Sequence, residues 1–195
     1  KIEEGSENIL VGAVDEITDS SYIIQQRLGL LKGTQAGEGA QFFLLSREAG
    51  SHSLAEIRGV ETYAGKQTAE EISSRISRFL QRYGLEPQDI HWLITGKTGP
   101  TDKTDTVITE ENRFSLQDGS IKGENEIYKK LETELFPNSL SLSFKDECGE
   151  YPTASSYAVW KAVKELASCN DTVNLLIYNH HHSINHSLML IRKSV

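Results

Sequence analysis

Apolar residues recur along the chain either in short runs or at helical spacing. Short runs, each of which fits one β-strand, occur at residues 9–14, 40–45, 54–63, 90–95, 140–144, 173–178 and 188–191. Helical spacing occurs at residues 20–31, 68–83, 124–136 and 152–167. Because the two kinds of segment alternate along most of the chain, the pattern predicts an α/β fold.

Several local signals sharpen these elements. Thr68 and Glu71 form a capping box that starts one helix, and Pro137 stops another. The helix at 152–167 is apolar on more than one face, which predicts a place between two layers. The last two strands, joined by a polar turn at residues 179–186, are expected to pair antiparallel.

The charge and the lengths of the apolar runs argue against some classes of function. The net charge of -8 and the pI near 5.3 argue against a nucleic-acid-binding protein, which normally carries clustered Lys and Arg. An acidic carrier protein would also need a basic patch, and the 20 scattered basic residues could form one only in three dimensions. No apolar run reaches the roughly 20 residues of a membrane span, so no membrane partner is expected.

The two cysteines indicate the redox environment of the protein, and the lack of a linker indicates how many domains the chain has. Cys148 and Cys169 show neither a disulfide framework nor a zinc motif, which fits a reducing cytoplasm. The chain has no internal repeat and no low-complexity linker. We therefore assign residues 1–195 to one unit without an internal boundary.

Four segments together resemble the condensing enzymes of the β-ketoacyl-ACP synthase family. Residues 10–16 are similar to the strand with an acidic end that follows the family's nucleophile helix, and residues 37–45 to its glycine-rich entry into the next strand. Residues 145–156 are similar to a family motif in which a lysine is followed by three residues, by Gly-His and then by a helix that begins with small residues. Residues 173–193 resemble the family's closing hairpin. The resemblance implies a thiolase-like layered αβαβα fold, of which this chain supplies about half.

The same resemblance implies partners. They are the N-terminal half of the same fold or a ketosynthase subunit, and an acyl carrier protein, in a dimer that needs no cofactor. The nearly continuous apolar strands at 9–14 and 40–45 need cover on both faces, which also predicts a second packing partner.

The family's chemistry requires a cysteine that holds the acyl chain, two histidines that assist decarboxylation, and a nearby lysine. The cysteine would lie upstream of residue 1, and only Lys145 matches the remaining set. Glu150 stands where the second histidine is expected, and a carboxylate cannot donate a hydrogen bond to an enolate oxygen unless protonated. Residues 93–98, which include Gly96 and Lys97 as candidate binding residues, contain no histidine where the first is expected.

The turn at 179–186 carries further candidates. His180, His181 and His182 could replace the missing donors, and Asn185 corresponds to an asparagine of the family's closing hairpin. A metal site is an alternative, because His180 and His182 share a strand face and His182 and His186 are four residues apart. No acidic or cysteine ligand is fixed nearby by the sequence, so no metal ligand is assigned. Gly96-Lys97-Thr98 lacks the first glycine of a phosphate-binding loop, since His91 stands there.

The sequence is consistent with three functions. The first is a catalytically degenerate component of fatty-acid or polyketide/polyene elongation, similar to a chain length factor, with this chain alone inactive. Phe42, Phe43 and Trp160 would then belong to a tunnel wall or, more simply, to the core. The second is a divergent active 3-oxoacyl-ACP synthase, and the third is a metal- or ligand-binding module built on the histidines.

Overall fold

A computed structural model describes residues 7–28, 35–98, 119–181 and 184–193. It contains a two-stranded and a five-stranded sheet, the second with strand order β3-β7-β6-β4-β5. The strands are β1 (Asn8–Asp15), β2 (Gly39–Ser46), β3 (Ala55–Ala64), β4 (Trp92–Thr95), β5 (Leu140–Ser143), β6 (Asn174–His181) and β7 (Asn185–Lys193). The helices are α1 (Asp19–Arg27), α2 (Ala69–Gln81), η1 (Pro87–Asp89), α3 (Gly119–Lys130), η3 (Leu131–Leu135), α4 (Lys145–Cys148) and α5 (Ala154–Ala167).

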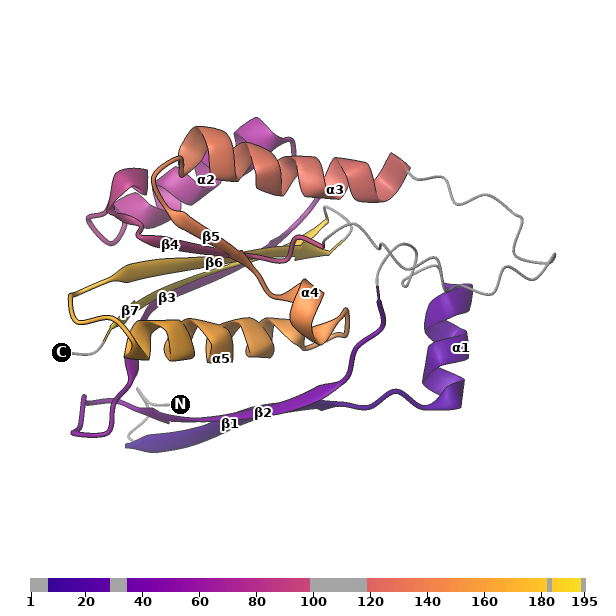
Figure 1. Ribbon diagram of the computed structural model, residues 1–195, viewed down its shortest axis with the longest axis horizontal. Helices are drawn as coiled ribbons and strands as arrows, with labels where there is room; N and C mark the ends of the chain where they lie inside the picture. Colours follow the sequence, from indigo (N-terminus) through magenta and orange to yellow (C-terminus); the bar gives the residue numbers. More distant parts are fainter. Residues whose placement is uncertain (1–6, 29–34, 99–118, 182–183, 194–195) are drawn as a thin grey trace.

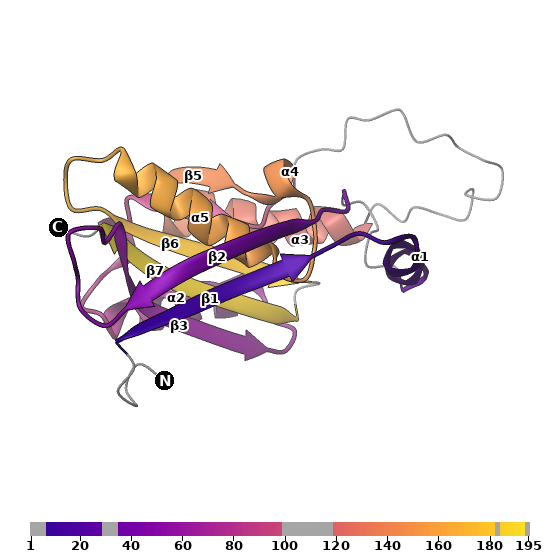
Figure 2. The same cartoon turned by 90° about the horizontal axis from the view of Figure 1, so that it is seen from below.

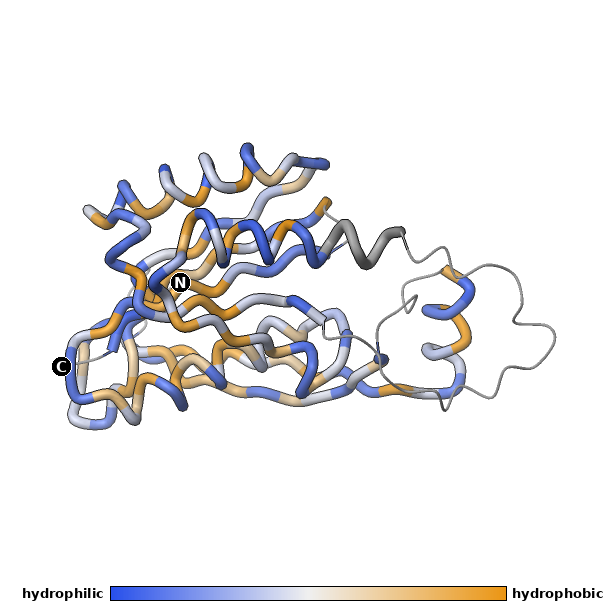
Figure 3. Tube along the Cα trace, turned by 45° about the horizontal axis from the view of Figure 1, so that its top comes forward, coloured by the Kyte–Doolittle hydropathy of each residue, from blue (hydrophilic) through white to orange (hydrophobic). Residues whose placement is uncertain are grey.

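The elements form four layers (Figure 1). α2 and α3 cover one face of the five-stranded sheet, α5 covers the other, and the β1–β2 hairpin lies beyond α5 (Figures 1 and 2). Two apolar cores result, one between the sheet and α2/α3 and one between the sheet and α5. Figure 3 shows hydrophobic segments along the central strands and alternating character along the helices. These layers confirm the predicted thiolase-like α/β class, with part of the complete αβαβα arrangement present.

Local sequence chemistry accounts for several element boundaries. At the start of α2, Thr68 accepts from the Glu71 amide at 3.3 Å and the Glu71 carboxylate accepts from the Thr68 amide at 2.8 Å. Ile72, Ile76 and Phe79 bury one face of this helix against the sheet. The capping box and the amphipathic pattern therefore predicted this helix correctly.

α5 occupies the inner position that its sequence predicted. Ala154, Ala158 and Ala162 are buried in the core against the sheet, and the helix also contacts β2 on its other side. Small side chains on the sheet-facing side allow close approach of the helix to β6 and β7.

The predicted limits of the last two strands were wrong. The turn was expected at 179–186, but β6 continues to His181 and β7 begins at Asn185, with His180 opposite His186. Backbone pairing, and stacking of the His180 and His186 rings on Tyr128 and Tyr63, keep these polar residues in the ladder, so their polarity did not mark a turn. β6 and β7 do pair antiparallel, as predicted.

The hairpin exposes one apolar face. Its outward-facing side chains are those of Leu10, Val14, Phe42 and Leu44. The exposed fraction is 62% for Phe42 and 72% for Leu44. Trp160 on α5 is also exposed, so the expectation that Phe42 and Trp160 are core residues was wrong for this chain on its own. The strands with nearly continuous apolar sequence thus have cover on only one side among the described residues.

None of the helices in the described ranges has the length and apolar content needed to cross a membrane.

Candidate functional site

The candidate residues gather at one edge of the five-stranded sheet. β4, β5 and β6 run parallel, so their carboxyl ends meet at the same edge. α4 follows β5 after one residue, and Glu150 comes two residues after α4 ends. In Figure 1, α4 lies beside this edge, next to the start of α5. Carboxyl ends of parallel strands are a common place for binding groups in α/β proteins.

Lys145 and Glu150 form the central pair of the site. The Lys145 Nζ lies 2.6 Å from the Glu150 Oε2. The Lys145 side chain is only 5% exposed and that of Glu150 is 15% exposed, so the pair is largely withdrawn from water. A pair in this setting holds both groups in fixed positions, because moving either one would leave a buried charge without its partner.

The backbone around Glu150 is fixed by two glycines. Gly149 has a φ of 75°, a conformation that glycine adopts without steric cost. A side chain on Gly37 would collide with the Cys148 carbonyl, so the two segments approach backbone to backbone. The Glu150 carbonyl accepts from the Gly37 amide at 3.0 Å, and the Glu150 amide donates to the Gln35 carbonyl at 2.7 Å. These contacts hold Glu150 at the sheet edge.

His181 reaches the same pair from the end of β6. Its Nδ1 lies 4.0 Å from the Glu150 Oε1, so the carboxylate stands between the lysine and the imidazole. The structure therefore brings together Lys145, Glu150 and His181, three of the residues singled out in the sequence. A carboxylate beside an imidazole can favour its protonated form and fix its orientation.

A second polar group lies beside the end of β4. Gly96 has no room for a side chain, because a β-carbon there would collide with the Asn179 amide oxygen and crowd the Tyr128 hydroxyl. The Asn179 Nδ2 donates to the Ser155 hydroxyl at 3.2 Å, and the Tyr128 hydroxyl lies 3.4 Å from the Asn179 Oδ1. An asparagine side chain thus fills the space next to the segment where the family resemblance places a histidine.

Lys97 and Asn185 are not part of the Lys145–Glu150 group. The Lys97 Nζ pairs with the Glu132 carboxylate at 2.8 Å, which directs it toward η3. Asn185 begins β7, exposed, opposite His181 in the ladder.

His180 faces the opposite side of the sheet from His181. Its ring stacks on Tyr128 with centroids 4.4 Å apart, and its amide donates to the Tyr128 hydroxyl at 3.0 Å. His186 joins this side, stacking on Tyr63 at 4.5 Å, with its Nδ1 3.0 Å from the Tyr178 hydroxyl. These two buried histidines belong to the aromatic core under α2 and α3, and His182 lies outside the described residues.

The cysteine near the site is not an activated nucleophile. Burial raises the pKa of the Cys148 thiol to about 11, so it is protonated at neutral pH. Its Sγ lies 3.3 Å from the Gly149 carbonyl. Burial also raises the pKa of the neighbouring Tyr151 hydroxyl, to about 12. Cys148 therefore behaves as a packed thiol beside the site.

The start of α5 is tied to β1 through Asp15. The Asp15 carboxylate accepts from the Thr153 amide at 3.0 Å and from the Thr153 hydroxyl. A carboxylate at this point satisfies a free amide at the helix start and interacts favourably with the helix dipole. This contact joins the acidic end of β1 to the small-residue helix, two segments that carried the family resemblance.

The described residues contain no group of three or more His, Cys, Asp and Glu side chains that could hold a metal ion. His180 and His181 point to opposite faces of β6, as neighbours on a strand must.

The groups gathered at this edge are a matched ion pair, an imidazole and an amide side chain. The charge on Lys145 is already matched by Glu150, and the Asn179 atom nearest Gly96 is the amide oxygen, a hydrogen-bond acceptor.

No family model and no curated protein matches the chain. Solved structures do resemble it. The PfaC keto synthase–chain length factor superimposes with a TM-score of 0.73 at 15% identity, over 97% of this chain and 20% of that chain. The ishigamide ketosynthase/chain length factor gives a TM-score of 0.68 at 16% identity, over 100% and 51%.

A third similar structure is the AntDE:AntF complex, a type II PKS acyl-carrier protein with its ketosynthase. It gives a TM-score of 0.64 at 15% identity, covering 100% of this chain and 54% of that chain. The fold of this chain is therefore that of part of a ketosynthase or chain length factor. The chain spans between a fifth and about half of the length of these structures.

Sequence reasoning missed Asn179, Tyr128 and Ser155. Ser155 lies in the small-residue helix start that was noticed, but its partner is 24 positions away. Tyr128 has the spacing of an ordinary core residue, and Asn179 was assigned to a turn. No local signal joins these three, because the contacts arise only when α3, α5 and β6 pack on one sheet.

Proposed function

We propose that the chain is part of a catalytically degenerate ketosynthase-like protein, similar to a chain length factor, which assists a competent ketosynthase in fatty-acid or polyketide elongation. The observation that carries this proposal is the Lys145–Glu150 pair at 2.6 Å. An ionised carboxylate there accepts hydrogen bonds and repels a second carboxylate, whereas decarboxylation of a malonyl group needs a donor.

Gly96 supports the same proposal. The segment after β4 contains no histidine, and the Asn179 side chain occupies the space beside Gly96. Restoring an imidazole at this position would require Asn179 to move away from Ser155. The two positions at which the family resemblance expects histidines are thus both occupied by other groups.

The apolar face of the β1–β2 hairpin supports a protein partner. Leu10, Phe42 and Leu44 expose a patch that the N-terminal half of such a fold, or a ketosynthase subunit, would cover. An acyl carrier protein is the second partner in this proposal, since AntDE:AntF is a complex of this kind. We place the assembly in the cytoplasm, as a dimer, where the free thiols of Cys148 and Cys169 would remain reduced.

The test is to purify the protein alone and together with a ketosynthase that carries a nucleophilic cysteine, and to assay condensation with malonyl carrier protein. We expect no condensation by the protein alone, co-purification with the ketosynthase, and products whose chain length depends on the pair. Condensation by the protein alone at the rate of the pair would reject the proposal.

A divergent active synthase is the second candidate, and the position of His181 favours it. Its Nδ1 lies 4.0 Å from Glu150, so one imidazole does reach the site. If this candidate holds, His181→Ala abolishes condensation while His52→Ala, a change in an exposed loop, does not. Equal turnover of the two variants would reject it.

A metal-binding module is the third candidate. It would have to use His182 with His181, because His180 and His186 are packed in the aromatic core. Calorimetry with zinc separates this candidate from the others, since it alone requires binding at micromolar metal.

A further inference from the structure

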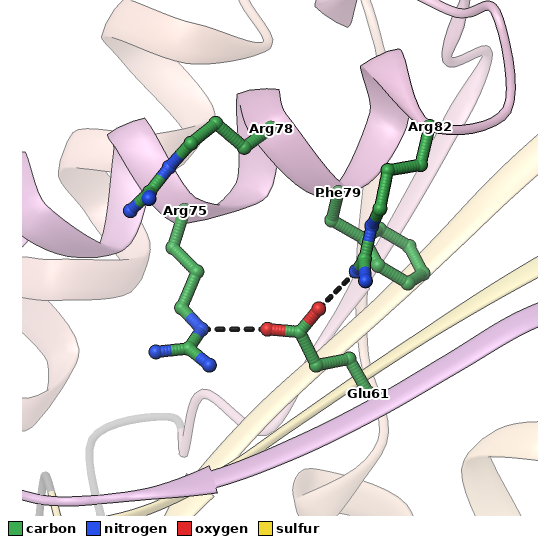
Figure 4. A pocket seen from close by; sticks show the side chains of 5 residues that line it. All are labelled: Glu61, Arg75, Arg78, Phe79 and Arg82. Atoms are coloured by element: carbon green, nitrogen blue, oxygen red, sulfur yellow. Dashed lines mark hydrogen bonds and ion pairs between the residues drawn. The ribbon is translucent and has the colours of Figure 1, made fainter.

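Three arginines line an open pocket between α2 and β3, far along the chain from the Lys145–Glu150 group. The pocket is lined by Glu61, Arg75, Arg78, Phe79 and Arg82 (Figure 4). The arginines stand at helical spacing of three and four residues, which places them on one side of α2. The sequence showed no basic patch, and this one forms only when β3 packs beside the helix.

Glu61 holds two of the arginines in place. The Arg75 Nε donates to the Glu61 Oε1 at 2.6 Å, and an Arg82 N–H group donates to the other carboxylate oxygen. Burial acts to raise the pKa of Glu61, but the hydrogen bonds from Arg75 and Arg82 outweigh it and keep this pKa below its usual value. Glu61 is therefore ionised at neutral pH.

Aromatic rings restrict the same guanidinium groups. The Arg75 Cζ lies 3.9 Å from the centroid of the Tyr63 ring, and the Arg82 Cζ lies 5.3 Å from that of Phe79. A guanidinium that is already held on a ring loses less freedom when it binds a ligand. Two of the three cations are thus preorganised before any anion arrives.

The pocket has a surplus of positive charge. Three guanidinium charges and one carboxylate leave two positive charges, in a chain whose net charge is -8. Within the described part of the chain, Arg78 forms no ion pair, and its Nε reaches only the Ser74 carbonyl at 3.4 Å. On adjacent elements the charges of Lys130 and Arg192 are each matched by a carboxylate, whereas Arg58 on β3 lies over the Tyr83 ring and adds to the positive charge of this region.

We propose that this arginine pocket is a binding site for the phosphate group of a small anionic ligand. A phosphate dianion matches the two surplus charges, and its oxygens accept paired N–H donors from planar guanidinium groups. A pocket lined by only five side chains, three of them arginines, suits a compact anion better than the broad surface of an acidic protein. The site lies outside the proposed role in chain elongation and does not depend on it.

The test is calorimetry of the full chain with inorganic diphosphate at low salt. We expect a Kd below about 1 mM, as for a few charge-assisted hydrogen bonds. Arg78→Gln should weaken binding by about tenfold, because it removes the arginine that Glu61 does not hold. The matched control is Arg47→Gln, which makes the same charge change after β2 and should alter Kd by less than about twofold.

Three outcomes would overturn the proposal. One is no binding of diphosphate up to about 10 mM. Another is equal weakening by Arg78→Gln and Arg47→Gln, which would show a general charge effect. The third is binding of polyglutamate without binding of diphosphate, which would indicate an acidic protein as the ligand. Arg78 is exposed, so its replacement leaves the fold intact, and thermal unfolding of both variants checks this.

Discussion

At the scale of single residues, the distinguishing feature is a carboxylate in a place where the family resemblance expects an imidazole. Glu150 is held by the Lys145 ammonium on one side and approached by His181 on the other. Its backbone is hydrogen-bonded to Gly37 and Gln35, so the residue cannot leave the sheet edge without breaking two hydrogen bonds.

Removal of the lysine charge tests how much this pair contributes to stability. Lys145→Met should lower the free energy of unfolding by about 2 kcal/mol, because the Glu150 carboxylate then stays largely buried without its cation. The double variant Lys145→Met/Glu150→Gln should recover most of that loss. Urea denaturation at pH 7 measures both, and equal losses in the single and double variants would contradict a coupled pair.

Cys148 gives a prediction about reactivity and pH. With its pKa raised by burial to about 11, the folded thiol should react slowly with iodoacetamide at pH 8, and faster as the pH rises toward 11. The measurement is the alkylation rate in a Cys169→Ser background, with the urea-unfolded protein as the control. Equal rates in the folded and unfolded protein at pH 8 would disprove the assignment of a packed thiol.

At the scale of elements, the sequence predicted a helix or strand boundary where a side chain hydrogen-bonds to the backbone a few residues away. The Thr68–Glu71 capping box marked α2 because its hydrogen bonds span three residues. The ends of β6 and β7 were not predictable, since His181 and His186 are kept in strands by partners far away in sequence. In the same way, the motif of Lys145 and Glu150 was visible in the sequence, whereas the contact of Asn179 with Gly96 was not.

The cap of α5 by Asp15 is an element-scale contact that can be tested. Asp15→Ala should cost about 1 kcal/mol of stability, because the Thr153 amide loses its acceptor. The effect should appear as faster amide exchange in the first turn of α5. Glu16→Ala, an exposed neighbouring change of equal charge, is the control, and equal effects of the two variants would count against the cap.

At the scale of the whole molecule, the layers fit only part of a larger fold. α5 lies between two sheets, but the outer sheet consists of the β1–β2 hairpin with one apolar face uncovered among the described residues. A face of this kind is a common site of protein contact.

Association should therefore be sensitive to charge on that face. Phe42→Lys and Leu44→Lys should abolish co-purification with a ketosynthase partner, because each buries an ammonium group in an apolar contact. Leu54→Lys is the matched control, since Leu54 is 61% exposed and lies outside the hairpin. Retention of the partner by the Phe42 and Leu44 variants would show that this face is not the contact.

The central claim is that the protein has lost the donors needed for decarboxylation. The most direct measurement is carbon dioxide release from labelled malonyl carrier protein by the purified protein alone, with and without His181→Ala. We predict release at the uncatalysed rate for both forms, because Glu150 and the Asn179 side chain lie where the family resemblance expects imidazoles. Rapid release by the unaltered protein that His181→Ala removes would contradict the claim.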